Sequence, residues 1–235
     1  MEKELILPPG YYKEKDAEDV YEKSFDTVFR YFTTNFMNGN LMEFGTYKGY
    51  SARKIASKMK EYDIKKDFYM FDSFEGLPEI ESNIDKNSYQ VKVHKDWQKG
   101  TFSKAKGYEV KLEQDVSDLI GKEQTHVVKG YFDETLDTIK FEKNSTILVN
   151  IDCDLYSSIK TVFDKLISEE VFQDGCVLLL DDYNFNRANN NMGVRKAVSD
   201  TFGKQRRYQI GFFFTYGWHG QAFFIHDTEG GIENE

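Results

Sequence analysis

Cysteine, proline and long apolar runs are all scarce in this sequence, and each shortage excludes something. Only two of the 235 residues are cysteine, Cys153 and Cys176, without a CxxC spacing, which excludes a disulfide framework and indicates a reducing compartment. Three prolines and no low-complexity linker or internal repeat favour one continuous domain. The opening MEKELILPPG has three consecutive apolar residues, too few for a signal peptide or a membrane span. We therefore expect a cytoplasmic protein with no membrane span.

The sequence also has no excess of positive charge. The chain has 31 Lys and Arg against 40 Asp and Glu, a formal charge of −9 at pH 7. Phosphate backbones are bound by clustered basic residues, whereas here basic and acidic residues are interleaved, so we expect no nucleic acid as a partner. Apolar sequence is plentiful, at 40% of all residues with 16% aromatic, which is enough for a substantial core.

The chain organisation predicted from these patterns is simple. After a loose first segment, residues 1–15, apolar residues recur at helical spacing and predict an amphipathic N-terminal helix over residues 16–37. Residues 81–108 are polar and weakly periodic, which makes them the candidate lid or inserted loop. We assign residues 16–235 to a single domain.

Strand-like and helix-like segments alternate through the middle of the chain. The expected strands are residues 41–44, 68–71, 125–128, 146–151 and 176–180, and the expected helices are residues 51–60, 110–120, 158–169 and 194–202. This alternation predicts an α/β fold with a parallel sheet covered by helices on both faces. Residues 209–216 and 221–226 differ, because they are aromatic-rich strands around a Gly-containing turn and predict an added antiparallel hairpin.

The first motif with chemical content is EFGTYKGYS, residues 43–51, where a predicted strand passes into a predicted helix. Gly45 and Gly49 allow a tight turn and a close approach of the backbone to a ligand, and the following helix offers free N–H groups. The stretch is neither a GxGxxG dinucleotide motif nor a P-loop. A Gly-containing turn with no ligand is the alternative interpretation.

The second motif is FDSFEGLP, residues 71–78, after the next predicted strand. Asp72 follows the glycine turn by roughly 25 residues, where an acid in a doubly wound sheet accepts hydrogen bonds from ribose hydroxyls. Asp72 and Ser73 also suit a helix cap or turn, which is the alternative. The glycine turn and the acid together favour nucleoside binding.

The third motif is a pair of acidic stretches, IDCDLY and LLDDYN, each after an apolar strand. In an extended chain alternate side chains share a face, so Asp152 and Asp154 are expected to project together, roughly 6.6 Å apart along the strand. Asp181 and Asp182 end the next predicted strand. If the two strands are neighbours, these carboxylates meet at the carboxyl edge of the sheet, where open α/β proteins bind ligands.

Carboxylates so close together repel one another unless a cation is present. An all-oxygen donor set favours Mg²⁺, with Mn²⁺ or Ca²⁺ as alternatives, and the side chain of Cys153 should point to the opposite face. A surface group of acids solvated by water is the competing interpretation. The four histidines have no ligand spacing; His94 and His219 could approach a substrate, with packed or surface roles as the alternative.

Several motifs together resemble a known family. They are FDSFEGLP, KGYFDETL at residues 129–136, DCDLYSS, and LDDY followed by GVRKAV at residues 193–198. In this order they resemble the macrocin O-methyltransferase (TylF-type) family, class I S-adenosylmethionine-dependent enzymes that methylate hydroxyls of sugars and related natural products. The resemblance extends over about residues 40–205.

The resemblance implies a Rossmann-like class I methyltransferase fold with a mostly parallel seven-stranded sheet and a C-terminal antiparallel hairpin. It also implies S-adenosyl-L-methionine as the cofactor. The matching cofactor-binding positions are Glu43, Gly45, Thr46, Gly49 and Ser51 for the methionine portion and Asp72, with Ser73 beside it, for the ribose.

The resemblance further implies a metal site and a base. Relatives hold magnesium through three acids, which correspond here to Asp152, Asp181 and Asp182, and the matching general base is Asp154. The implied partner is a small-molecule or glycan acceptor, methylated on a hydroxyl of a sugar, glycan or related natural product.

Two features depart from the family pattern, and two other functions stay open. Residues 47–50 read YKGY where relatives often have a Trp-Arg-Gly-Gly type of turn, and residues 184–192 are longer than expected. The alternatives are a DxD-type metal-dependent glycosyltransferase and a catalytically silent nucleotide-binding protein. The N-terminal helix and the aromatic hairpin are candidate surfaces for homo-oligomer formation.

Overall fold

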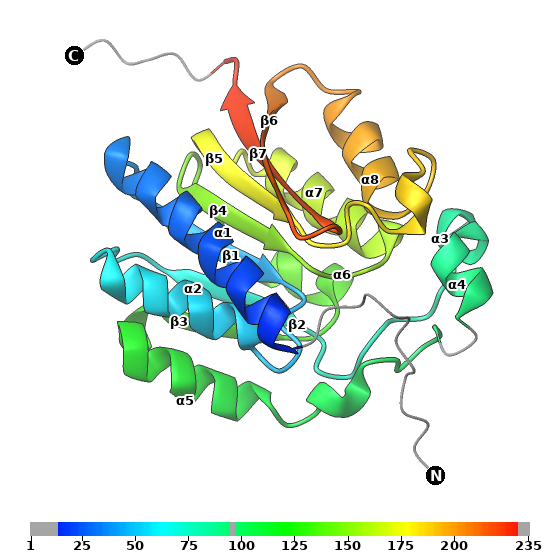
Figure 1. Cartoon of the computed structure of the whole chain (residues 1–235), viewed down its shortest axis with the longest axis horizontal. Helices are drawn as coiled ribbons and strands as arrows, with labels where there is room; N and C mark the ends of the chain where they lie inside the picture. The colour runs from blue at the N-terminus through cyan, green and yellow to red at the C-terminus, as the bar shows by residue number, and fades with distance from the viewer. Residues whose placement is uncertain (1–13, 95–96, 230–235) are drawn as a thin grey trace.

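Residues 14–94 and 97–229 are described by the computed structural model, and in them strands and helices alternate as the sequence predicts (Figure 1). The strands are β1 Asn40–Phe44, β2 Phe68–Asp72, β3 Thr125–Lys129, β4 Thr146–Ile151, β5 Phe172–Leu180, β6 Tyr208–Tyr216 and β7 Gly220–Asp227. The α-helices are α1 Glu14–Thr34, α2 Tyr50–Glu61, α3 Asn83–Asn87, α4 Tyr89–Val93, α5 Glu109–Ile120, α6 Phe132–Thr135, α7 Tyr156–Ser168 and α8 Gly193–Phe202. Short 3₁₀ helices are η1 Ser103–Ala105, η2 Lys122–Gln124, η3 Leu136–Thr138 and η4 Asn186–Ala188.

All seven strands form one sheet with the order β3-β2-β1-β4-β5-β7-β6. The first five strands in this order are parallel, and β7 pairs antiparallel with both β5 and β6. The predicted mostly parallel sheet with a C-terminal hairpin is therefore confirmed. The strand order reverses between β1 and β4, and ligands of open α/β sheets bind in the crevice at such a reversal.

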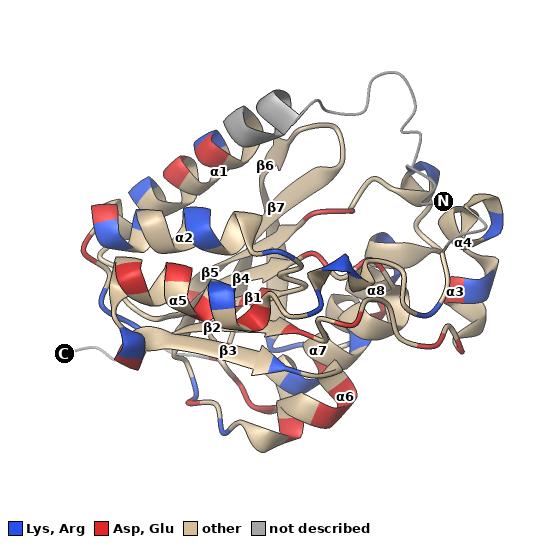
Figure 2. Cartoon of the chain, turned by 90° about the horizontal axis from the view of Figure 1, so that it is seen from below, with Lys and Arg blue, Asp and Glu red and all other residues tan. Residues whose placement is uncertain are grey.

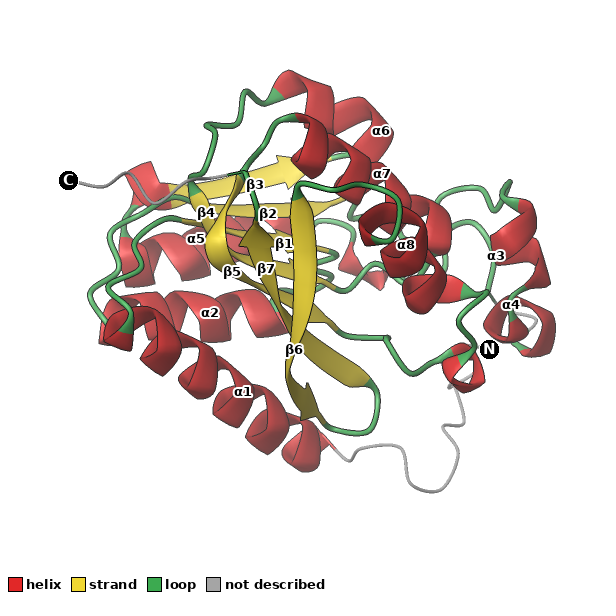
Figure 3. Ribbon diagram, turned by 90° about the horizontal axis from the view of Figure 1, so that it is seen from above, coloured by secondary structure: helices red, strands yellow, loops and turns green. Residues whose placement is uncertain are grey.

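Helices cover both faces of the sheet, as predicted. In Figure 3, α1, α2 and α5 lie on one side and α6, α7 and α8 on the other. Each side has its own apolar core. Strand β4 lies between them and is buried along its whole length, which explains its nearly continuous apolar sequence.

Helix α1 confirms the predicted N-terminal helix and shows why it forms. Phe25, Val28, Phe29 and Phe32 follow the helical period and are buried to 1% exposure or less. Burying each such side chain stabilises the fold by about 1.5–3 kcal/mol. The loose segment expected over residues 1–15 lies outside the described residues, apart from the two positions that begin α1.

The inserted segment contains more regular structure than its weak periodicity suggests. Two five-residue helices, α3 and α4, are each capped by a serine: Ser82 Oγ accepts hydrogen bonds from the N–H groups of Ile84 and Asp85, and Ser88 Oγ accepts one from Val91. Serine is a favoured N-cap because its oxygen satisfies N–H groups that the first turn leaves free. The role of residues 81–108 as a lid stays a prediction.

The charge distribution follows the interleaving seen in the sequence. Figure 2 shows basic and acidic residues mixed along α1, mostly basic residues on α2 and mostly acidic residues on α5. Lys58 of α2, for example, lies 3.0 Å from Glu22 and 3.4 Å from Asp26 of α1. Within residues 14–94 and 97–229, no helix combines the length and the apolar character needed to cross a bilayer.

Candidate active site

The turn after β1 is built around two glycines whose backbone no other residue fits. Gly45 has φ +88°, and a Cβ at this position would lie 1.8 Å from the carbonyl oxygen of Asp152. Its N–H donates a 2.9 Å hydrogen bond to the carbonyl of Phe71. Gly49 has φ +75°, and its Cβ would lie 2.3 Å from Leu112 Cδ1. The tight turn predicted from these glycines is therefore present, and at Gly45 it lets the end of β1 approach the backbone of Asp152 after β4.

Glu43, at the end of β1, is a fully buried acid beside this turn. Its Oε1 accepts a 2.8 Å hydrogen bond from Asn150 Nδ2. Burial raises the pKa of Glu43 to about 7, although hydrogen bonds from Ser51 and Asn150 oppose the increase. Among the described residues, Glu43 Oε2 and Thr46 Oγ1 are buried without a hydrogen-bond partner. Two buried polar atoms without partners next to a ligand crevice fit a bound polar group.

Asp72 and Ser73 stabilise a turn, which was the alternative to ribose binding in the interpretation of these two residues. Asp72 accepts hydrogen bonds from the N–H groups of Tyr47 at 2.7 Å and Phe74 at 2.6 Å. Ser73 Oγ donates to the carbonyl of Gly76 at 2.9 Å. Burial raises the pKa of Asp72, and those backbone N–H groups oppose the increase. Both side chains still border the cavity described next, so the turn role does not replace a binding role.

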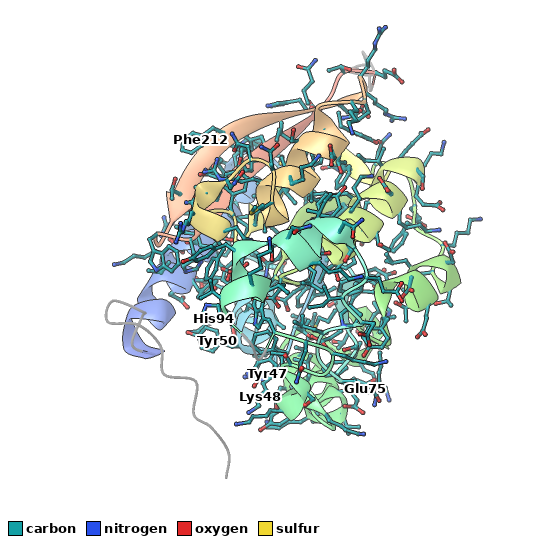
Figure 4. The ribbon with its side chains drawn as sticks, turned by 90° about the vertical axis from the view of Figure 1, so that its right-hand side faces the viewer. Tyr47, Lys48, Tyr50, Glu75, His94 and Phe212 are labelled. Carbon is teal, nitrogen blue, oxygen red and sulfur yellow. The ribbon has the colours of Figure 1, made fainter. Side chains whose placement is uncertain are left out.

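A cavity of about 400 Å³ opens at the carboxyl edge of the sheet. It is lined by Gly45, Tyr47, Asp72, Ser73, Gly76, Leu77, Pro78, Glu79, Glu81, Ser82, Phe102, Gly130, Tyr131, Phe132, Asp133, Asp152, Cys153, Asp154, Ser157, Ser158 and Thr161. Its volume is typical of small-molecule and cofactor pockets. Figure 4 views the molecule from the side where the parallel strands end. Phe212, on β6, lies apart from the other labelled residues, which are Tyr47, Lys48, Tyr50, Glu75 and His94.

The loop after β3 was missed as a candidate binding segment. Tyr131, Phe132 and Asp133 line the cavity together with the glycine turn. The sequence did contain a signal, because β3 is parallel to β2 and its carboxyl end must reach the same edge of the sheet. Cys153 also borders the cavity and packs in the apolar core at 8% exposure; the expectation that its side chain points to the opposite face from the acids stays a prediction.

The first two acids lie in a turn and not on a strand. Strand β4 ends at Ile151, Asp154 has φ +62°, and the N–H of Leu155 donates to the carbonyl of Cys153 at 2.6 Å. The extended geometry expected for Asp152 and Asp154 is therefore wrong. A turn brings these side chains to the cavity, and a positive φ at a non-glycine residue is a strained conformation that tends to occur at functional sites.

The other two acids also follow a strand end. Strand β5 ends at Leu180, and the N–H of Asp181 donates a 3.0 Å hydrogen bond to the carbonyl of Ile151 on the neighbouring strand. Asp181 and Asp182 occupy the turn that follows. Because the chain turns here, strand alternation does not force the two adjacent side chains to opposite faces.

The structure brings the four predicted acids together, and we call Asp152, Asp154, Asp181 and Asp182 the acid cluster. Burial, then the charges of Asp181 and Asp182, raise the pKa of Asp152 well above its ordinary value. Burial and the Asp154 charge likewise raise the pKa of Asp182. Burial and the Asp152 charge raise the pKa of Asp154 to about 8, although a hydrogen bond with Asp182 opposes this. A hydrogen bond between two carboxyls requires a shared proton, so the cluster needs protons or a cation.

The chemistry of the acid cluster suits a hard divalent cation, since all of its donors are oxygens. Its arrangement is less complete: within the described part of the chain, no group of three or more His, Cys, Asp or Glu side chains is placed to hold a metal ion. The donor chemistry therefore fits Mg²⁺, and metal binding stays a proposal.

Two further residues hold Asp181, and neither role was predicted from the sequence. The hydroxyl of Tyr21, in α1, donates a 2.5 Å hydrogen bond to Asp181 Oδ1. His219 Nδ1 lies 3.1 Å from the carbonyl oxygen of Asp181 and 3.4 Å from its Oδ1. Burial lowers the pKa of His219, but the side chain and carbonyl of Asp181 raise it, and the net direction is upward. Both contacts depend on how α1 and the β6–β7 hairpin pack beside β5.

Comparisons with known proteins show solved structures that share this fold. The O-methyltransferase NovP has a TM-score of 0.69 at 19% identity, over 87% of this chain and 79% of NovP. The calicheamicin methyltransferase CalS11 has a TM-score of 0.69 at 17% identity, over 90% of this chain and 80% of CalS11. An O-methyltransferase from Bacillus cereus in complex with SAH has a TM-score of 0.53 at 12% identity, over 95% of this chain and 94% of its own. At these identities the likeness shows a shared fold.

Family membership comes from the sequence comparison. No curated protein matches the chain. The family model described as Macrocin-O-methyltransferase (TylF) matches residues 22–208, well over half of the sequence. The chain therefore belongs to the TylF macrocin-O-methyltransferase family and is an S-adenosylmethionine-dependent O-methyltransferase.

Proposed function

We propose that this chain methylates a hydroxyl of a sugar, glycan or related natural product, with a divalent cation held at the acid cluster. The observation that carries the proposal is the position of the cluster. Asp152 and Asp154 line the cavity, whereas Asp181 and Asp182 are outside its lining among the described residues and lie toward α1 and the β6–β7 hairpin. A methyl donor and an acceptor that share the cavity would thus meet beside Asp152 and Asp154.

The cavity side suits S-adenosylmethionine. Glu43 Oε2 and Thr46 Oγ1 are buried and unpaired within the described residues, so a donor such as the ammonium of the methionine portion would satisfy the acid. Gly45 lines the cavity at this end, Gly49 and Ser51 follow it in the same turn outside the cavity lining, and Asp72 with Ser73 would bind the ribose. When bound, the cofactor supplies an electrophilic methyl group on a sulfonium.

Asp152, Asp181 and Asp182 would hold the cation, with Mg²⁺ first and Mn²⁺ or Ca²⁺ as alternatives. When bound, such an ion supplies Lewis-acid stabilisation of negative charge on an oxygen. It would also offset the mutual repulsion that raises the pKa of Asp152 and Asp182. Tyr21 and His219 would keep Asp181 oriented for this task.

We assign to Asp154 the role of general base, the group that accepts the proton of the acceptor hydroxyl. It lines the cavity beside Asp152, and a carboxylate placed within reach of the reacting hydroxyl can act as a general base. In the proposed reaction its carboxylate accepts the proton of the acceptor hydroxyl while the oxygen attacks the methyl carbon. Holding the oxygen opposite the departing sulfur supplies much of the rate, because the translational and rotational entropy of the reactants is then lost on binding and not in the reaction step.

A sugar acceptor is supported by the nature of the similar proteins. CalS11 is described as a TDP-rhamnose 3'-O-methyltransferase, with a TM-score of 0.59 and 16% identity to this chain in its apo structure. An acceptor with vicinal hydroxyls would offer two oxygens to one cation. We therefore propose a small molecule or glycan of this kind. A cytoplasmic location and homo-oligomer formation stay predictions from the sequence.

Calorimetry and methyl transfer test the proposal together. The first experiment titrates the protein with S-adenosylmethionine and, separately, with UDP-sugars. Binding of only the UDP-sugars would overturn the methyltransferase assignment in favour of a glycosyltransferase. The second incubates the protein with S-adenosylmethionine, Mg²⁺ and nucleotide-linked deoxysugars, and follows methylated product by mass spectrometry, with EDTA as the comparison. Full activity in EDTA would contradict the metal role.

A further inference from the structure

Helix α7 begins without a capping residue of its own. It follows directly on the Asp154 turn, and its N-cap position, Leu155, has a side chain that accepts no hydrogen bond. The cap comes from Asp85 of α3, whose Oδ1 accepts from the N–H of Tyr156 at 2.8 Å and whose Oδ2 accepts from Ser157 at 3.1 Å. Asp85 is only 2% exposed. A carboxylate at a helix N-terminus is stabilising, so α3 anchors the C-terminal side of the Asp154 turn.

The next helix, α4, makes a second buried link, to the loop after Asp182. The N–H of Gln90 donates to Asn186 Oδ1 at 3.0 Å, and Asn186 Nδ2 donates to Gln90 Oε1 at 2.9 Å. Both residues are nearly inaccessible, at 5% and 6% exposure. The guanidinium of Arg187 lies 3.8 Å from the centre of the Tyr89 ring and hydrogen-bonds to its hydroxyl. Two segments far apart in the sequence are thus joined by paired amides and a cation–π contact.

The linked loop has a backbone that needs such support. Asn186, Arg187 and Ala188 have φ values of +54°, +59° and +52°. Three consecutive non-glycine residues in the left-handed region are strained and persist only where surrounding contacts hold them. The contacts with α4 are of that kind.

We propose that residues 83–93 act as a bracket that fixes the two halves of the acid cluster relative to each other. Asp85 is the first arm of the bracket and holds the turn that carries Asp154. Gln90 is the second arm and binds Asn186, which holds the loop that follows Asp182. Asp85, Gln90 and Asn186 are positioning residues, since they act through the acids. In Figure 1, α3 and α4 stand beside the loop before α8.

The inference rests on the proposed function, because the bracket matters for turnover only if the acid cluster transfers the methyl group. Its contacts exist without any ligand, however, so they are measurable in the unliganded protein. Failure of the wild type to methylate any sugar acceptor would count against the proposed function alone. Fast amide exchange at Tyr156 and Ser157 in the wild type would count against the bracket alone.

The first test compares three variants by steady-state kinetics and by calorimetry with S-adenosylmethionine. Asp85→Ala is expected to lower kcat on the order of tenfold to a hundredfold, because small displacements of reacting groups have effects of that size. Its cofactor Kd is expected to stay within about twofold. Asp85→Asn should recover only part of kcat, since its amide keeps one of the two oxygens that accept from Tyr156 and Ser157. Asn87→Ala, which removes an exposed local hydrogen bond in α3, is the matched control and should leave kcat unchanged.

Equal losses of kcat and cofactor affinity in Asp85→Ala, or no recovery in Asp85→Asn, would overturn the bracket and leave Asp85 a general stabilising residue. Amide exchange gives a readout without turnover. The N–H groups of Tyr156 and Ser157 should exchange faster in Asp85→Ala and remain slow in Asn87→Ala; unchanged exchange would contradict the capping role.

A double-mutant cycle tests the second arm. Gln90→Ala and Asn186→Ala should each lower kcat, and the double variant should be no slower than the worse single variant, because both substitutions remove the same reciprocal pair. Losses that multiply in the double variant would show that the two residues act separately and would overturn this arm.

Discussion

The hydroxyl of Tyr21 donates a 2.5 Å hydrogen bond to Oδ1 of Asp181, across 160 residues of sequence. Burial and the nearby charges of Asp181 and Asp152 raise the pKa of Tyr21, so the phenol remains a donor. His219 approaches the same carboxylate from the β6–β7 hairpin. With Oδ1 engaged by these neighbours, Oδ2 is the oxygen that we assign to a ligand. The N-terminal helix thus contributes to the site and not only to the core.

The Tyr21→Phe variant tests this contribution. Removing the hydroxyl frees the Asp181 carboxylate to rotate, and loss of such an outer partner weakens metal binding about 10- to 100-fold in known sites. We expect the Kd for Mg²⁺ to rise by that factor in calorimetry. Tyr31→Phe is the control, because the Tyr31 hydroxyl lies on the same helix but donates to the carbonyl of Gly175 at 3.2 Å. Equal Mg²⁺ affinity in both variants would contradict the orienting role of Tyr21.

Glu43 should make the stability of the protein depend on pH. Its pKa is raised from 4.5 to about 7 in the folded state, so the protonated form stabilises the fold below about pH 4.5 and that stability is lost as the pH rises through 7. A shift of this size corresponds to about 3 kcal/mol. Between about pH 4 and pH 8, the unfolding free energy of the wild type should fall by that amount relative to Glu43→Gln, measured by urea denaturation.

Glu109 is the control, because its pKa is shifted in the opposite direction from that of Glu43. The hydrogen bond with Lys129 lowers the pKa of Glu109, so its stabilisation is present above its unfolded pKa and is lost as the pH falls. Glu109→Gln should therefore weaken the fold at neutral pH and have little effect in acid. The same direction of pH dependence for both variants would contradict the account of Glu43.

Gly45 should tolerate no side chain. Because a Cβ would lie 1.8 Å from the Asp152 carbonyl oxygen, Gly45→Ala must push the ends of β1 and β4 apart. We expect a loss of unfolding free energy on the order of 3 kcal/mol or more, together with loss of S-adenosylmethionine binding. Gly100→Ala is the matched control: Gly100 also has a positive φ, +81°, but nothing lies within 4 Å of its Cβ position. Its cost should be about 1–2 kcal/mol, and equal losses would contradict the steric argument.

The sequence predicted those parts of the fold that depend on local pattern. Residues 146–151 form a continuous apolar run and become the buried strand β4, and the helical period in α1 appears as four buried residues on one face. Pairing two acidic motifs after neighbouring strands also predicted the acid cluster. Each of these inferences needs only a period, a strand end and the rule that parallel strands end at one edge.

What the sequence could not predict depends on packing between distant segments. Nothing near Asp181 indicates that Tyr21 reaches it, because that contact requires α1 to lie beside β5 and β7. Asp85 likewise reads as a surface acid in a polar stretch, yet it is buried against α7. The positive φ of Asp154 was missed for a different reason, since extended geometry was assumed to continue beyond the end of β4.

The most direct test of the central claim is single-turnover methyl transfer by Asp154→Asn, at saturating S-adenosylmethionine with Mg²⁺ and an acceptor that the wild type uses. We predict unchanged cofactor binding and a rate lower by about 10²–10⁴, the usual contribution of a general base. Asp118→Asn, a change on α5 where the acid only binds Gln114, should react like the wild type. A rate for Asp154→Asn equal to that of the wild type would contradict the assignment of Asp154 as the proton acceptor.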